Sequence, residues 1–221
     1  SECLVGSEMC IRDSGTSGVV EPMSSQALLD TIRLELNMRH AQNSQIAAVS
    51  PGNYGLDFMK ETYGYDLDDS VKCSNFIGET IDMAVECGFE KMLLTGHIGK
   101  LVKVSGGIMN THSREADCRV ELLAAAGLRA GVSRDNLMKI LDSATTTEAI
   151  AYLEEEKKTK PVMEYLMERI IYYTNKRAGG KMKIECILYD NQYGELAKSE
   201  GAEEFLHELQ HENVTVSGTT I

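Results

Sequence analysis

Three short apolar runs, separated by segments with helical spacing, constrain the fold of this chain more than any other feature. The runs cover residues 45–50, 91–95 and 182–189. Runs of this length and apolar content are typical of strands that are buried on both faces of a parallel sheet. Because they alternate with helical segments, we expect an α/β fold, with layered helices around a mostly parallel or mixed sheet.

Capping residues and apolar spacing predict the helices between these strands. The first expected helix starts at Ser24 or Ser25, the second runs from Ser74 to Gly88, and the third runs from Thr111 or Ser113 to Gly131. A short helix is expected over 133–141, and a capping box at Thr145 opens the next one. A long helix is expected from Pro161 to Gly179. Residues 194–210 are expected to be helical, and residues 214–216 to form a strand.

Residues 94–117 combine flexible backbone positions with many hydrogen-bonding side chains, and we expect them to form a loop-rich segment between a strand and a helix. Its polar members are His97, Lys100, Lys103, Asn110, His112 and Arg114, and its glycines include Gly106 and Gly107. Residues 91–119 carry more Lys and Arg than Asp and Glu, although the whole chain has a formal charge of -12. A local positive patch predicts an anionic ligand with carboxylate or phosphate groups. Chance clustering on a solvated face gives the same pattern, so charge alone leaves both interpretations open.

Several kinds of site are disfavoured. The sequence around Gly99 and Lys100 fails the phosphate-binding loop pattern at both ends, because Leu94 and Leu101 occupy its first glycine and its Ser/Thr position. His97 and His112 have no acidic or cysteine neighbour at metal-ligand spacing, so no metal site is expected. Cys118 is expected inside a helix and Ser113 as a cap, which argues against a nucleophile at either position.

A second candidate site follows the first apolar run. Gly52, Asn53 and Gly55 form a glycine turn between an expected strand and an expected helix. That geometry is typical of turns that bind a nucleotide or sulfonium cofactor, although most glycine turns are only turns.

Composition limits the partners and the compartment. The acidic charge argues against general binding to nucleic acid or to an anionic membrane. No apolar run reaches the roughly 20 residues that a membrane-spanning helix needs. The six cysteines show neither zinc-site nor disulfide-framework spacing, which fits a reducing cytoplasm.

The first residues are unlike the rest of the chain. Residues 4–14 read L-V-G-S-E-M-C-I-R-D-S, which is what a widely used transposase sequencing adapter encodes in one reading frame. We therefore expect residues 1–14 to be a non-native artefact and exclude them from reasoning about the fold.

Four long strings carry a family resemblance. They are S-G-V-V-E-P-M-S, S-P-G-N-Y-G-L-D-F, K-C-S-N-F-I-G-E-T-I-D-M-A-V-E-C-G-F and L-T-G-H-I-G-K-L-V-K-V-S-G-G-I-M-N-T-H-S-R-E-A-D. In order and spacing they resemble the cobalt-precorrin-5B C1-methyltransferase (CbiD) family, over residues 15–209. The resemblance implies a cytoplasmic enzyme of anaerobic cobalamin (vitamin B12) biosynthesis that methylates C1 of cobalt-precorrin-5B to give cobalt-precorrin-6A. S-adenosyl-L-methionine is the implied methyl donor, and cobalt enters only as part of the substrate.

With this resemblance, each candidate residue receives an expected role. Residues with cationic heads or a close-approaching backbone are expected to bind the carboxylate-fringed corrin precursor: Lys100, Lys103, Arg114, Gly106 and Gly107. Residues that can line the ring or adjust its protons form the expected catalytic set: His97, His112 and Asn110. Those of the glycine turn are expected to bind the cofactor: Gly52, Asn53 and Gly55.

The resemblance also implies an incomplete chain. Family members carry a further N-terminal portion of comparable size, so residues 15–210 are expected to be the C-terminal α/β portion of a larger two-domain protein, with a tail over 211–221. Cys118 departs from the family pattern, which has a small residue there. A homo-oligomer and hand-over of the substrate from neighbouring pathway enzymes are compatible with this assignment. The alternatives are a non-catalytic tetrapyrrole- or nucleotide-binding module and an inert fragment.

Overall fold

The strands form one mixed sheet of five in the order β2-β1-β3-β4-β5. The computed structural model describes residues 24–52 and 56–217. The strands are β1 (Ile46–Ser50), β2 (Val71–Lys72), β3 (Lys91–His97), β4 (Lys183–Asp190) and β5 (Gly194–Lys198). Strands β1 to β4 are parallel to one another, and β5 pairs antiparallel with β4 at one edge. The expected α/β fold with a mostly parallel sheet is confirmed.

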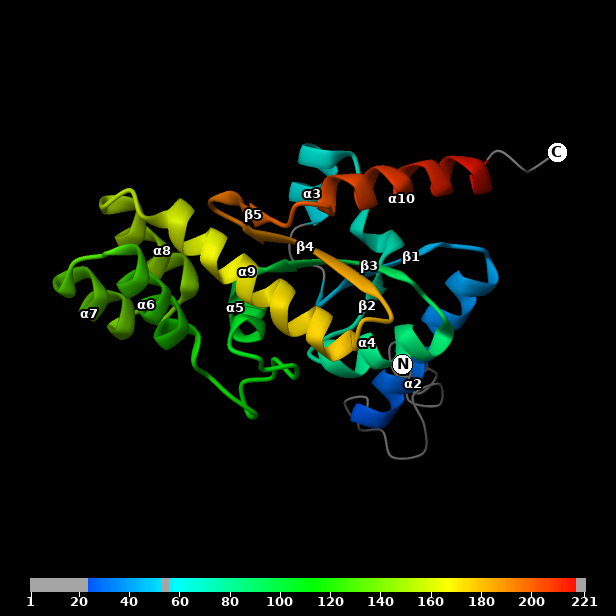
Figure 1. The fold of residues 1–221 in the computed structure, drawn as a ribbon, viewed down its shortest axis with the longest axis horizontal. Helices are drawn as coiled ribbons and strands as arrows, with labels where there is room; N and C mark the ends of the chain where they lie inside the picture. Colours follow the sequence, from blue (N-terminus) through cyan, green and yellow to red (C-terminus); the bar gives the residue numbers. More distant parts are fainter. Residues whose placement is uncertain (1–23, 53–55, 218–221) are drawn as a thin grey trace, which may run out of the picture.

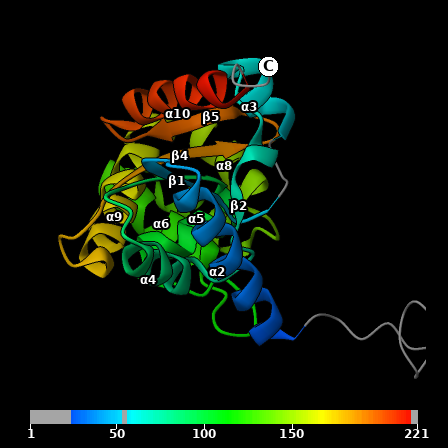
Figure 2. The same ribbon diagram turned by 90° about the vertical axis from the view of Figure 1, so that its right-hand side faces the viewer.

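Helices cover both faces of the sheet (Figures 1 and 2). One face carries α2 (Ser25–Ala41), α4 (Ile77–Cys87), α5 (Ile98–Ser105) and α9 (Thr159–Ala178). The other carries α3 (Leu56–Tyr63) and α10 (Ala202–Ser217). A short 3-10 helix, η1 (Leu67–Asp69), precedes β2. Three further helices, α6 (Arg119–Ala130), α7 (Arg134–Asp142) and α8 (Thr146–Glu155), pack together beside α9.

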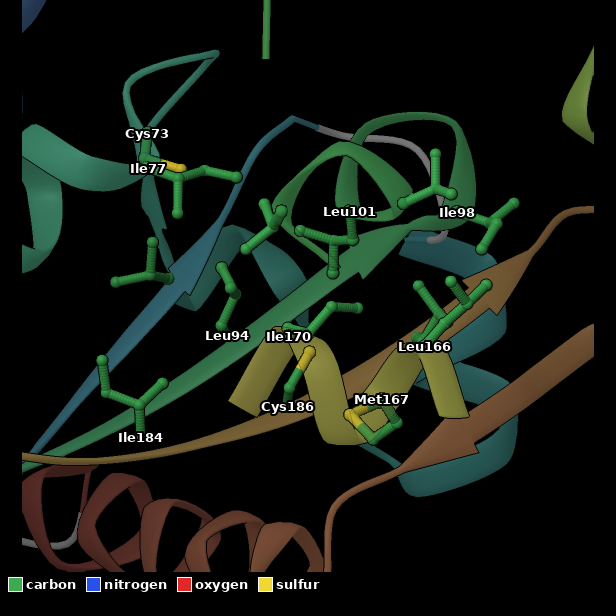
Figure 3. Packing of buried hydrophobic residues seen from close by; sticks show 14 of the residues in the cluster. Cys73, Ile77, Leu94, Ile98, Leu101, Leu166, Met167, Ile170, Ile184 and Cys186 are labelled. Carbon is green, nitrogen blue, oxygen red and sulfur yellow. The ribbon is translucent and has the colours of Figure 1, made fainter. Parts of the chain in front are cut away.

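Alternation along the strands divides the core into two layers. Ala47 and Val49 of β1 belong to the larger apolar cluster, with residues of α4, α5 and α9, whereas Ile46 and Ala48 face the smaller cluster under α10. Figure 3 shows the larger cluster, in which Leu94 and Cys186 of the sheet lie against Ile170 of α9. Because both faces are covered, β1 is buried along its whole length, which is why its sequence is continuously apolar rather than alternating.

The segment 94–117 differs from its prediction. It is not one loop, because β3 continues to His97 and α5 starts at the next residue. The following helix, α6, starts only at Arg119, so the predicted caps at Thr111 and Ser113 are wrong. Cys118 is the N-cap residue of α6, with no side-chain cap bond, and does not lie inside the helix. Thr111 lies in the loop before α6, where its N–H donates a hydrogen bond to the carbonyl of Asn75.

Other boundaries give a mixed outcome. Of the two predicted N-caps Ser24 and Ser25, Ser24 caps α2, and the stops at Gly88, Gly131 and Gly179 are confirmed. The helix expected over 133–141 is α7, and Ser133 is its N-cap rather than its first residue. Ser74 does not cap α4, whose N-cap residue is Phe76. The predicted helix over 194–210 is wrong in its first part, which forms β5, and the predicted strand over 214–216 lies within α10.

Candidate functional site

A cavity of ≈ 540 Å³ opens at the carboxyl ends of β1, β3 and β4. The chain runs from β1 to β2 on one side and returns to β3 on the other, so the strand order reverses between β1 and β3. In open parallel sheets, the crevice outside the strand ends at such a reversal is the usual ligand site. The residues that line this cavity are Pro51, Gly52, His97, Gly99, Lys100, Arg119, Thr145, Thr146, Thr147, Tyr189, Asp190, Asn191 and Gln192.

His97 is both the last residue of β3 and the N-cap of α5. Its Nδ1 accepts a hydrogen bond from the backbone N–H of Gly99 at 3.0 Å, and its Nε2 lies 3.3 Å from Oδ2 of Asp190. Since Nδ1 accepts, the neutral ring carries its proton on Nε2, facing that carboxylate. Burial lowers the pKa of His97 below its ordinary value, and the charge of Asp190 only partly offsets this.

Asp190 ends β4 and is almost fully buried. The hydroxyl of Thr147 donates to its Oδ2 at 2.8 Å, and the N–H groups of Gln192 and Tyr193 donate to its Oδ1 at 2.8 Å and 3.3 Å. These donors compensate the loss of water around the carboxylate. The sequence-based prediction missed Asp190. Its position at the carboxyl end of a predicted strand was the available signal.

Lys100 lines the same cavity from the first turn of α5. Its ammonium donates to the carbonyls of Pro51 at 2.6 Å and Ser74 at 3.1 Å. It therefore ties the segment after β1 to the segment before α4. Burial lowers the pKa of Lys100, and the nearby charge of Lys103 acts in the same direction.

The start of α8 forms the opposite wall. Thr145, Thr146 and Thr147 all line the cavity, and Thr145 caps the helix by accepting from the N–H of Glu148. The sequence-based prediction recognised the cap but assigned no site role to these residues. Three consecutive hydroxyl side chains at a helix start do not by themselves indicate a binding site. They do so here because the fold places the start of α8 beside the strand ends.

Arg119, the first residue of α6 after the loop 106–118, also lines the cavity. Its guanidinium forms a two-point contact with Asp117, with Nε 2.7 Å from Oδ1 and Nη2 3.2 Å from Oδ2. From the sequence, Arg119 was part of the positively charged segment 91–119, but no binding or catalytic role was predicted for it. Its forked pairing leaves the remaining guanidinium N–H groups as further donors.

Several predicted site residues do not line this cavity. Lys103 is 3% exposed, and its ammonium donates to the carbonyls of Thr111 at 3.1 Å and Ala116 at 2.8 Å. Asn110 accepts from the N–H of His112 at 3.1 Å, and Nδ1 of His112 accepts from the N–H of Arg114 at 3.0 Å. These contacts shape the loop 106–118 itself.

Gly106 and Gly107 allow close packing within the protein. A Cβ at Gly106 would lie 3.0 Å from Leu122, and one at Gly107 would lie 3.0 Å from the ring of Tyr173. Gly107 also has a φ of +83°, a conformation that favours glycine. Gly52 does line the cavity, whereas Asn53 and Gly55 lie outside the described residues.

Within residues 24–52 and 56–217, the structure contains no cluster of three or more His, Cys, Asp or Glu side chains that could hold a metal ion. In the same part of the chain, none of the helices is long and apolar enough to cross a lipid bilayer.

Comparisons with known proteins identify related sequences. Residues 110–200 match the family described as "CbiD, C-terminal domain". The chain is 44% identical over 204 residues to a protein of Ruminiclostridium cellulolyticum named cobalt-precorrin-5B C(1)-methyltransferase, an alignment that covers 90% of this chain and 53% of that protein. Proteins with the same name from Alkaliphilus metalliredigens and Methanocaldococcus jannaschii are 40% and 36% identical, covering 90% and 84% of this chain and 53% and 51% of theirs. The chain therefore spans about half the length of the curated relatives it matches. No solved structure matches it.

Proposed function

Because the chain belongs to the CbiD family, we propose that it carries part of an S-adenosyl-L-methionine-dependent methyltransferase that converts cobalt-precorrin-5B to cobalt-precorrin-6A. The reaction belongs to cobalamin biosynthesis in the cytoplasm, and cobalt takes part only as a component of the substrate. The observation that carries the proposal is the cavity at the carboxyl ends of β1, β3 and β4, lined by His97, Lys100 and Arg119. It lies in a chain that resembles such enzymes over nine tenths of its length.

The chemistry requires positioning more than a strong protein nucleophile. A carbon–carbon π electron pair of the corrin ring forms the bond from C1 to the methyl group, while the pair of the sulfur–methyl bond returns to sulfur. The positive charge of the sulfonium passes to the ring system and is released as a proton. Holding the two reactants in line supplies most of the acceleration in such a step. Nδ1 of His97 is occupied by Gly99 and Nε2 faces Asp190, so we assign His97 to orienting the ligand rather than to accepting this proton.

A cavity of ≈ 540 Å³ falls within the usual range for small-molecule sites. We assign it to the cofactor, with Pro51 and Gly52 in its lining. The corrin macrocycle then lies over its mouth, near Arg119. Asn53 and Gly55, which lie outside the described residues, keep their proposed role in binding the cofactor.

The loop 106–118 is proposed to contact the carboxylates of the macrocycle. Arg114 and His112 are exposed on it, and Asn110 fixes its shape through the N–H of His112. Lys103 supports the loop from beneath by its bonds to two carbonyls, and Gly106 and Gly107 let it turn tightly at the end of α5. Lys100 supports the cavity wall through the carbonyl of Pro51.

The second candidate, a non-catalytic tetrapyrrole- or nucleotide-binding module, is favoured by one observation: both ring nitrogens of His97 in the cavity lining already contact protein groups, the N–H of Gly99 and the carboxylate of Asp190. Both candidates bind the same ligands, so only product formation separates them.

The test incubates this chain, and separately the full-length relative from Ruminiclostridium cellulolyticum as a positive control, with cobalt-precorrin-5B and methyl-labelled S-adenosylmethionine. Mass spectrometry of the macrocycle is the readout. A labelled product from this chain supports the enzyme. Binding of both ligands without product, alongside an active control, supports the binding module and overturns catalysis by this chain alone. The variant Lys100→Ala is expected to weaken binding, and unchanged binding and turnover would overturn its role.

A further inference from the structure

Thr146 presents an unusual hydroxyl to the cavity. The residue is 3% exposed and lines the cavity wall. Unlike Thr145 and Thr147, whose hydroxyls bond to the N–H of Glu148 and to Asp190, Thr146 has no hydrogen-bond partner for its hydroxyl among the described residues. Although the residue as a whole is buried, its hydroxyl oxygen is not among the fully enclosed, unpartnered side-chain atoms of the described residues, so it opens onto the cavity. There it can exchange a bound water for a polar group of a ligand.

Two helices begin at this place. Thr146 is the first residue of the ten-residue helix α8, whose cap residue also lines the cavity. Across from it, α5 begins beside His97, and Thr146 Oγ1 lies 3.7 Å from the position that a Cβ on Gly99 would occupy. The absence of a side chain at Gly99 therefore leaves the space between the two helix starts open. N–H groups of a first helical turn lack intrahelical acceptors, and the helix dipole adds partial positive charge there.

The charged side chains around the cavity point to the same kind of ligand. Lys100 and Arg119 contribute two cations to its lining. The one carboxylate in that lining, Asp190, is already paired with Thr147 and two backbone N–H groups. Donors and positive charge with few free acceptors favour a small planar anion.

We propose that Thr146 and the start of α8, facing the start of α5, form a subsite that binds a carboxylate group of a small molecule. The identity of that molecule rests on the proposed function, which supplies two carboxylate-bearing ligands. One is the amino-acid end of S-adenosylmethionine, and the other is an acetate or propionate arm of the macrocycle. The subsite itself stands on the geometry and does not require turnover.

The experiment measures dissociation constants by calorimetry with the complete chain. The first pair of probes is S-adenosylmethionine and its decarboxylated form, which differ only in the carboxylate. The second probe is uroporphyrin III, a stable tetrapyrrole fringed with carboxylates. The variants are Thr146→Val, which removes the hydroxyl at nearly constant shape, and Thr146→Ser, which retains it. Thr174→Val is the matched control, since Thr174 is a fully buried threonine in α9 whose hydroxyl donates to the carbonyl of Ile170.

We expect Thr146→Val to weaken binding of the carboxylate-bearing ligand by about 10-fold or more, the usual effect of losing one hydrogen bond to a charged group. Thr146→Ser restores most of this loss, and Thr174→Val leaves binding unchanged. If S-adenosylmethionine is affected and its decarboxylated form is not, the cofactor supplies the carboxylate. If only uroporphyrin III is affected, the macrocycle supplies it.

Unchanged affinity of every probe in Thr146→Val overturns the subsite, as does failure of the wild-type chain to bind any of them. Thermal unfolding of each variant distinguishes a binding defect from a folding defect, and Thr146→Ala, which also removes the hydroxyl, takes the place of Thr146→Val if that variant does not fold. Because the readout is binding, loss of methyl transfer with intact carboxylate-dependent binding contradicts the proposed function and not this subsite.

Discussion

Nε2 of His97 lies 3.3 Å from Oδ2 of Asp190, at the carboxyl ends of two adjacent parallel strands. The contact joins β3 to β4 beyond the last ladder pair of the two strands, His97 with Tyr189. Because Gly99 donates to the other ring nitrogen, the imidazole is fixed from both sides. The wall of the cavity is therefore held by side chains as well as by the sheet.

The stability of the protein should depend on the protonation of His97. Burial lowers the pKa of His97 in the folded state, whereas in the unfolded chain a histidine has a pKa of about 6.5. As the pH falls below about 6.5, the unfolded state binds the proton more readily, so the free energy of unfolding decreases. Urea unfolding across this range should show a weaker pH dependence for His97→Gln than for wild type. His112→Gln, on the exposed loop, is the control, and identical pH profiles for His97→Gln and wild type would contradict the prediction.

Lys103 is expected to stabilise the fold rather than bind substrate directly. Lys103→Met removes two hydrogen bonds from a buried ammonium to the carbonyls of Thr111 and Ala116 and should lower the free energy of unfolding by about 2 kcal/mol or more. Lys160→Met, an exposed lysine in α9, should change it by less than about 0.5 kcal/mol. Chemical denaturation measures both. A Lys103→Met protein with wild-type stability and no ligand binding would restore the substrate-binding role.

Gly107 should be less tolerant of alanine than another glycine with positive φ. Gly107→Ala incurs the backbone cost of φ +83° and also places a methyl group 3.0 Å from the ring of Tyr173. Gly179 has φ +61° and nothing within 4 Å of an added Cβ, so Gly179→Ala should cost only the backbone term of about 1–2 kcal/mol. The difference between the two variants in thermal unfolding measures the crowding against Tyr173. Equal costs would mean that the ring moves aside freely.

Thiol reactivity should separate the described cysteines into two classes. Cys73 and Cys186 are fully buried, and burial raises the pKa of Cys73 to about 12. Thiolates are the reactive species. Iodoacetamide at mildly alkaline pH should therefore modify the partly exposed Cys87 and Cys118 before the buried Cys73 and Cys186. Peptide mapping by mass spectrometry reports the order, and labelling in denaturant is the control. Early modification of Cys73 in the folded protein would refute the buried core around it.

Local sequence signals predicted the centre of the sheet but not its edge. β1, β3 and β4 followed from apolar runs, because burial on both faces requires them. β5 was missed, because Gly194–Lys198 is partly polar and becomes a strand only by pairing with β4. Thr111 and Ser113 resembled helix caps. The buried ammonium of Lys103 and the bond from Thr111 to Asn75 hold that segment as a loop instead, and neither contact is visible in local sequence.

The site was predictable only in the part that lies close together in sequence. His97 and Lys100 share one segment, and both line the cavity together with Gly52. Asp190 and Thr146 come from distant segments, and their proximity depends on the strand order and on the position of α8. Local sequence does not give the strand order, so it could not show that Asp190 and Thr146 share a cavity. Lys103 was expected beside Lys100 at the ligand because both lie in one positively charged segment, whereas of the two only Lys100 lines the cavity.

The cavity wall is assembled from the ends of β1, β3 and β4 and from the start of α8. No single hairpin or helix pair contains it, so it disappears when any of these segments detaches. A ligand bound there would be thermodynamically linked to global unfolding rather than to local opening. A shift in the melting temperature of the whole chain would then be a sensitive assay for what occupies this cavity, even before any product is detected.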